Sequence, residues 1–195
     1  DAWTGAIRDM IQLRDGTVVF TSQMLLHNPG RHATVTYRST DDGRNWERSN
    51  IIDLGGIGHH DGAIESTIVE RGDGSILMLL RTNWGSLWRA VSQDKGKTWH
   101  PIGPSDIAAS SAPAILERLA SGRIFIAWNR YHHEGTNDFP KYGGDFQGTG
   151  TETSNNRQEL SIAFSDDDGK SWGEPAVIAT VMPGQAGVYP EKYPQ

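Results

Sequence analysis

The chain has 195 residues, 36% of them hydrophobic and 22% charged, and its 24 acidic and 18 basic side chains leave a formal net charge of −6. This length suits one globular domain with a core of its own. No apolar stretch approaches the roughly 18 to 20 residues of a membrane helix, and the acidic balance argues against nucleic acid as the main partner. We therefore expect neither a membrane span nor nucleic-acid binding.

Cysteine is absent, whereas glycine and tryptophan are abundant, with 23 and 7 residues. The lack of thiols excludes a disulfide scaffold and a thiolate metal site, but it does not fix the compartment. A secreted or periplasmic location is favoured over a cytoplasmic one. The chain opens at Asp1 without a Met or a signal peptide, as expected for a processed protein or a fragment.

Helical periodicity is nearly absent, and short apolar or alternating runs bounded by Gly, Asp and Asn predict many antiparallel strands. In chain order, a strand, a tight turn and a second strand are predicted three times, in residues 10–20, 68–80 and 115–128. Gly16, Gly74 and Gly122 mark the three turns. The sequence therefore predicts an all-β fold built from a repeat.

An octamer of the form S-x-D-x-G-x-x-W follows each of these strand pairs. Its fixed positions are Ser39, Asp41, Gly43 and Trp46, then Ser92, Asp94, Gly96 and Trp99, and finally Ser165, Asp167, Gly169 and Trp172. We predict a hairpin turn in which Gly takes a positive φ, the Asp carboxylate accepts backbone amides, and the Trp opens the next strand and packs the turn down. An EF-hand reading fails, because a glycine at position six would place Arg38 or Phe164 at a ligand position. We expect no metal and no cofactor.

Four antiparallel strands in each repeat of roughly 50 residues are typical of a propeller blade. The predicted blades cover about residues 5–54, 62–104 and 111–180, and residues 184–195 begin a fourth. Three blades do not close a ring, since propellers use roughly four to eight. The remaining blades are expected from a missing part of a longer chain or from another copy.

Two charged residues stand at the ends of strands that are otherwise apolar. Glu65 opens the first strand of the second repeat and Arg81 ends the next one, so both should emerge at the end of the hairpin opposite the Gly74 turn. A salt bridge that caps the hairpin and a functional pair are both open at this point.

Other polar residues lie near this pair in the sequence. His60 and Asp61 belong to the glycine-rich loop that leads into Glu65, and Asn83 follows Arg81, so these side chains are candidates for lining a pocket. Packing between blades is the alternative for Asn83. The long insertion 131–156 is rich in Gly, Thr and Asn, which favours a functional loop at the rim.

The three octamers resemble Asp boxes, the turn motif of the sialidase (neuraminidase) superfamily and related BNR-repeat proteins. The resemblance covers nearly the whole chain and implies a six-bladed β-propeller, of which this chain supplies about blades three to five and the edge of the sixth. Asp boxes also occur in propellers that are not sialidases. The octamers therefore support the fold more strongly than the activity.

The resemblance also assigns roles to individual residues. Glu65 and Arg81 look like the family's catalytic Glu and one of three arginines that clamp the substrate carboxylate. Arg157, in a strand that runs into the third octamer, matches another arginine of that triad. Tyr189 occupies the place of the nucleophilic tyrosine, with Tyr193 as a competitor. The partner implied is sialic acid or a related acidic glycan.

The implied reaction is retaining cleavage by an exo-α-sialidase. The first arginine of the triad and the acid/base aspartate of the family are not found in these 195 residues, so we expect the chain alone to be inactive. A catalytically silent propeller that binds carbohydrate or mediates adhesion is the alternative interpretation. A half-propeller that pairs with itself is a third.

Overall fold

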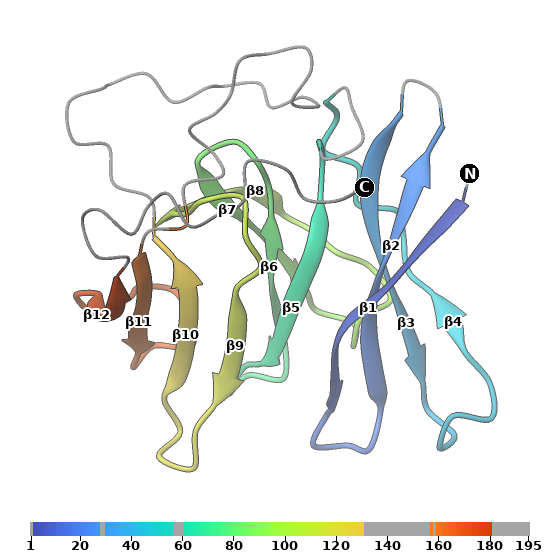
Figure 1. The fold of residues 1–195 in the computed structure, drawn as a ribbon. Coiled ribbons are helices and arrows are strands. Elements are labelled where there is room, and N and C mark those ends of the chain that lie inside the picture. The colour runs from blue at the N-terminus through green and yellow to red at the C-terminus, as the bar shows by residue number, and fades with distance from the viewer. Residues whose placement is uncertain (1, 28–29, 57–60, 131–156, 158, 181–195) are drawn as a thin grey trace.

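The computed structural model describes residues 2–27, 30–56, 61–130, 157 and 159–180. Within these residues twelve strands form three antiparallel sheets of four strands each, and no helix occurs (Figure 1). The predicted all-β fold is confirmed for this part of the chain. Residues 184–195, where we predict the start of a further blade, lie outside it.

In each sheet the strand order follows the sequence, so every sheet is a simple meander. The first sheet contains β1 (Ala2–Gln12), β2 (Val18–Leu26), β3 (Arg31–Ser39) and β4 (Glu47–Arg48). The second contains β5 (Ile64–Glu70), β6 (Ile76–Arg81), β7 (Ser86–Ser92) and β8 (Ile102–Ala108). The third contains β9 (Ile115–Arg118), β10 (Ile124–Asn129), β11 (Glu159–Ser165) and β12 (Ala176–Thr180). β1 begins at Ala2, before the predicted start of the first repeat at residue 5, and β8 ends at Ala108, beyond the predicted end of the second repeat at residue 104.

The hairpin turn between the first two strands has the same geometry in all three sheets. Gly16, Gly74 and Gly122 have φ values of 91°, 85° and 88°, a region that favours glycine. In each turn the glycine N–H donates to the carbonyl three residues earlier, at 2.8, 3.1 and 2.9 Å. The turns that the sequence predicts at these three glycines are confirmed.

The three octamers also fold alike. The first-position serine hydroxyl accepts the N–H of Gly43, Gly96 or Gly169 at 2.9, 2.8 and 2.8 Å. The aspartate Oδ1 accepts the backbone N–H four residues further on, at 2.9, 2.7 and 2.9 Å. All three glycines have a positive φ, as predicted. The tryptophan precedes the next strand instead of opening it, because β4, β8 and β12 begin only after the turn has closed.

The octamer of one sheet packs on the second strand of the sheet before it. A Cβ on Gly96 would lie 2.9 Å from a methyl of Val19, and one on Gly169 would lie 2.5 Å from a methyl of Leu77. At Gly43 the only atom within 4 Å of such a Cβ belongs to Trp46 of the same octamer. The first octamer thus lacks, among the described residues, the neighbouring sheet that the other two have.

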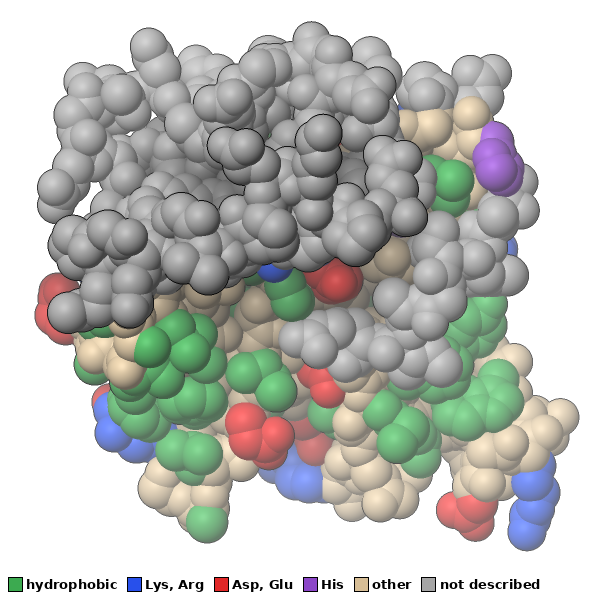
Figure 2. Space-filling view, in the orientation of Figure 1, with side chains coloured by type: hydrophobic (Ala, Val, Ile, Leu, Met, Phe, Trp, Pro, Cys, Tyr) green, Lys and Arg blue, Asp and Glu red, His purple; other side chains and the backbone are tan. Residues whose placement is uncertain are grey.

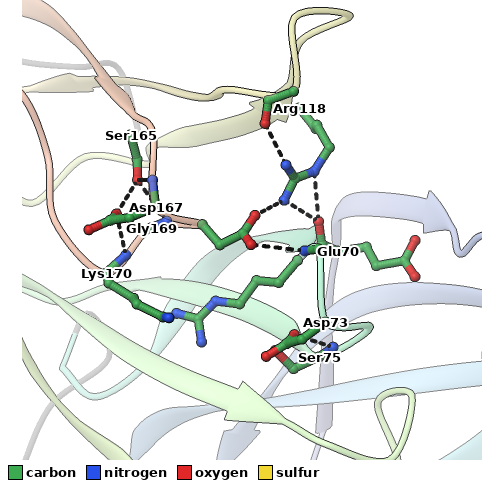
Figure 3. A network of polar contacts seen from close by, with 12 residues as sticks. Glu70, Asp73, Ser75, Arg118, Ser165, Asp167, Gly169 and Lys170 are labelled. Atoms are coloured by element: carbon green, nitrogen blue, oxygen red, sulfur yellow. Dashed lines mark hydrogen bonds and ion pairs between the residues drawn. The ribbon is translucent and has the colours of Figure 1, made fainter.

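Polar contacts reinforce the junction between the second and third sheets (Figure 3). Arg118 of β9 donates to the Glu70 carbonyl at 3.0 and 2.9 Å and pairs with Asp168 of the third octamer. Asp168 also accepts the Gly72 N–H at 3.1 Å. Because these bonds join residues about 50 or more positions apart in the two sheets, they fix the position of one sheet against the other.

The hydrophobic core lies between the sheets in two main clusters. One joins the first and second sheets around Val19, Ile68 and Trp99, and the other joins the second and third around Leu77 and Ile126. The first strands β1, β5 and β9 contact one another in succession. On the face shown in Figure 2, hydrophobic and charged side chains are intermixed below the residues that are not described.

Candidate functional site

The pairing of β5 with β6 places Glu65 and Arg81 at one end of the second sheet. Ile64 pairs with Arg81 and Thr67 with Leu79, so β5 carries one extra residue in between, which is a β-bulge. The start of β5 and the end of β6 lie at the upper edge of the sheet in Figure 1, opposite the hairpin turns. The predicted proximity of Glu65 and Arg81 is confirmed.

Glu65 adopts a left-handed backbone conformation, with φ of 44°. This region costs a residue other than glycine roughly 1–2 kcal/mol, so surrounding contacts must hold it there. The first sheet supplies them: Gln23 Oε1 accepts the Glu65 N–H at 3.1 Å, and the Thr21 hydroxyl donates to the Ser66 carbonyl at 3.2 Å. The bulge is therefore fixed from a neighbouring sheet.

Arg81 donates to acceptors from β5 and from the segment between β8 and β9. Its Nη1 donates to Glu65 Oε2, and its Nε and Nη2 donate to the Ser111 hydroxyl at 3.2 and 3.1 Å. Its side chain is 11% exposed, compared with 29% for Glu65. Arg81 is therefore fixed by protein contacts while the carboxylate of Glu65 keeps access to solvent.

Arg157 joins the same cluster through Ser111, since its Nη2 donates to the Ser111 carbonyl at 2.9 Å. Burial lowers the pKa of Arg81, Glu65 raises it, and the positive charge of Arg157 lowers it again. Arginine remains protonated in proteins, so both guanidinium groups are charged. Two positive groups and one carboxylate leave the cluster of Glu65, Arg81, Arg157 and Ser111 with one excess positive charge.

Asp61 is buried and bound by the protein itself. Its Oδ1 accepts the Trp84 indole N–H at 2.8 Å and the Gly62 N–H at 2.9 Å. Gly56 leaves no room for a side chain beside this carboxylate, because a Cβ there would lie 2.4 Å from Asp61 Oδ2. Asp61 thus anchors the segment 61–63 that leads into β5, and its expected part in lining a pocket stays a prediction.

The remaining predicted site residues are either buried or lie outside the described part of the chain. Asn83 is buried two residues beyond the end of β6, before Trp84 in the chain. His60, Tyr189 and Tyr193 lie outside the described residues, as does the insertion 131–156. Their proposed parts in a site stay predictions.

The sequence interpretation missed Ser111 and Gln23. Ser111 lies between β8 and β9 in a run of small residues, and Gln23 lies inside a strand, so neither stands out by its spacing. Both act on residues more than 25 positions away. A search for polar residues that the repeat pattern leaves unexplained would have flagged Gln23.

Among the described residues, no group of three or more His, Cys, Asp or Glu side chains is arranged to hold a metal ion. That part of the chain likewise contains no helix long and apolar enough to cross a membrane. The chemistry that the cluster itself offers is anion binding by two guanidinium groups, with a carboxylate at hand as a base.

Comparison with solved structures shows the same fold in several proteins. The chain matches a protein of unknown function from Dyadobacter fermentans (TM-score 0.53, 16% identity, 86% of this chain and 51% of that one). It matches the NanB sialidase from Streptococcus pneumoniae (TM-score 0.58, 18% identity, 87% of this chain and 23% of that one). It also matches an α-L-arabinofuranosidase from Fusarium graminearum (TM-score 0.51, 16% identity, 87% of this chain and 47% of that one).

The chain therefore spans about half the length of these proteins or less. The comparison with curated proteins gives no match. Among family models, the BNR repeat-like domain matches residues 3–191, which is nearly the entire chain. The chain thus belongs to the family of BNR repeat-like domains, with a fold shared by sialidases.

Proposed function

We propose that the protein containing this chain is a sialidase-like glycosidase that removes a terminal sialic acid, or a related acidic sugar, with retention at the anomeric carbon. The observation that carries the proposal is the cluster of Glu65, Arg81 and Arg157 around Ser111. Its excess positive charge suits a ligand with a carboxylate, and two guanidinium groups bind a carboxylate with strong hydrogen bonds.

In this mechanism Arg81 and Arg157 hold the sugar carboxylate. An anionic nucleophile would be repelled by that carboxylate, so a neutral tyrosine is the better attacking group. Tyr189 would attack the anomeric carbon while Glu65 takes its phenolic proton, and the bond to the leaving group would break as a general acid protonates the departing oxygen. Water, giving its proton to that same acid/base group, would then displace the tyrosine from the sugar, with Glu65 returning the phenolic proton to Tyr189. The role of Tyr189 rests on the family resemblance.

The first arginine of the clamp and the general acid would come from other blades of a six-bladed ring, in a longer chain or in another copy. The first octamer supports this part of the proposal. Trp46 is 41% exposed, whereas Trp99, its counterpart in the second octamer, is 0% exposed against the first sheet. A further sheet placed before the first would cover Trp46 in the same way.

The test is release of a fluorogenic aglycone from a sialic acid glycoside by the full-length protein. Glu65→Gln and Tyr189→Phe should each lower kcat by orders of magnitude, whereas Tyr193→Phe should not, which would assign the nucleophile. Binding of N-acetylneuraminic acid without turnover by the unaltered protein would favour the silent carbohydrate-binding module. Absence of both binding and turnover would refute the proposal, and turnover by the 195-residue chain alone would refute the need for further blades.

A further inference from the structure

The two junctions between sheets both contain an octamer tryptophan, but its surroundings differ between them. In each, the octamer of the later sheet packs against the second strand of the earlier one, and at the first junction Gly96 also lies against Thr36 of the third strand. At the first junction Trp99 is fully buried. Its indole N–H donates to the Thr36 hydroxyl at 2.8 Å, and its backbone N–H donates to Asn50 Oδ1 at 2.9 Å. Two polar side chains thus seal Trp99 into this junction.

The second junction lacks both of these side chains. Counted from the octamer serines, Arg89 stands where Thr36 stands and Gly103 stands where Asn50 stands. Strand register agrees, because Arg89 pairs with Leu79 as Thr36 pairs with Thr21. The Arg89 side chain is too long to take the place of a threonine and is exposed, and glycine offers no acceptor side chain.

Trp172, the third octamer tryptophan, is consequently only partly buried, and its indole N–H makes no hydrogen bond within the described residues. A cleft of about 420 Å³ opens beside it between the second and third sheets. Leu77, Ile107 and Ile126 of the core lie among its lining residues. This size and apolar floor are typical of sites for small molecules.

Charged side chains also line the cleft. Arg89, Arg130 and Lys170 carry positive charge and Asp106 and Glu174 negative charge, and none of the five forms an ion pair in the part of the chain that the structure describes. The excess of one positive charge favours an anion. Displacing water from a charged group is costly unless the ligand pairs with it, so a cation without a partner here favours a ligand that brings an anionic group.

We propose that this cleft is a second ligand site, separate from the Glu65 cluster, for a small molecule with an apolar ring and one anionic group. The ring would lie on the apolar floor beside Trp172. The anion would lie near Arg89, within reach of the free indole N–H.

The test uses the full 195-residue chain and three probes of one shape: naphthalenesulfonate, neutral naphthalenemethanol and cationic naphthylmethylammonium. We expect saturable one-to-one binding of the sulfonate by calorimetry and at least about tenfold weaker binding of the other two. In two-dimensional NMR spectra the sulfonate should shift the indole N–H signal that Trp172→Phe removes. Equal binding of all three probes, or no saturable binding, would overturn the proposal.

The variant Arg89→Thr/Gly103→Asn rebuilds the sealed junction in place of the open one. No atom lies within 4 Å of a Cβ at Gly103, so the asparagine fits. Sulfonate binding should fall at least about tenfold in this variant, and the melting temperature should not fall. Arg44→Thr removes an exposed charge outside the cleft and should leave binding unchanged. Wild-type affinity in the double variant, or equal loss in both variants, would show that the cleft is not the site.

Discussion

The left-handed backbone at Glu65 makes a quantitative prediction, because alanine and glycine differ there mainly in backbone strain. Both Glu65→Ala and Glu65→Gly remove the ion pair with Arg81. At φ of 44°, alanine carries a penalty of roughly 1–2 kcal/mol that glycine avoids. Glycine gives back roughly 0.4–1 kcal/mol through the greater freedom of its unfolded chain. The Gly variant should therefore be more stable than the Ala variant by about 0.8 kcal/mol, the difference between the middles of these two ranges.

The assay is urea unfolding followed by circular dichroism, with a melting curve as a second measure. A difference of this size corresponds to about 1–4 °C for a chain of this length. The matched control is Glu117 in β9, an exposed residue without a positive φ, where the Gly variant should be less stable than the Ala variant. Equal stability of Glu65→Ala and Glu65→Gly, or the same order at both positions, would refute the claim that Glu65 is strained.

Three further predictions concern the octamers, the arginine cluster and acid stability. Gly96→Ala should cost about 1–3 kcal/mol more than Gly43→Ala in urea unfolding, because only Gly96 packs on Val19; similar costs would contradict the packing of the second octamer on the first sheet. Ser111→Ala should lower the unfolding free energy by about 1–3 kcal/mol, because it removes the acceptor of two Arg81 N–H groups. Ser111→Thr keeps a hydroxyl and should lose much less stability. An unchanged melting temperature in Ser111→Ala would argue against this contact. Lys95 and Thr17 hold the pKa of Asp15 at about 2, below its ordinary value of 3.8, so the ionised Asp15 stabilises the fold above pH 4 and this contribution is lost as the pH falls toward 2. The melting temperature of Asp15→Asn should therefore fall less steeply than that of the wild type between pH 4 and pH 2. Parallel curves would refute the assignment.

The sequence by itself determined the local turns and the strand pairs between them. Each octamer closes through hydrogen bonds that span four residues, from the serine to the glycine and from the aspartate to the residue beyond it, so its structure is contained in its own eight letters. The proximity of Glu65 and Arg81 followed for a related reason, because the hairpin through Gly74 fixes which ends of β5 and β6 meet.

Only the tertiary structure decided how these residues are held and what surrounds them. Gln23 reaches Glu65 from the first sheet, and Ser111 ties Arg81 to Arg157 across the second and third sheets. Such contacts leave no periodic trace, since they depend on how whole sheets pack and not on neighbours along the chain. Packing between sheets also explains why Trp99 is buried at one junction while a cleft lies beside Trp172 at the next, although the two octamers share one sequence pattern.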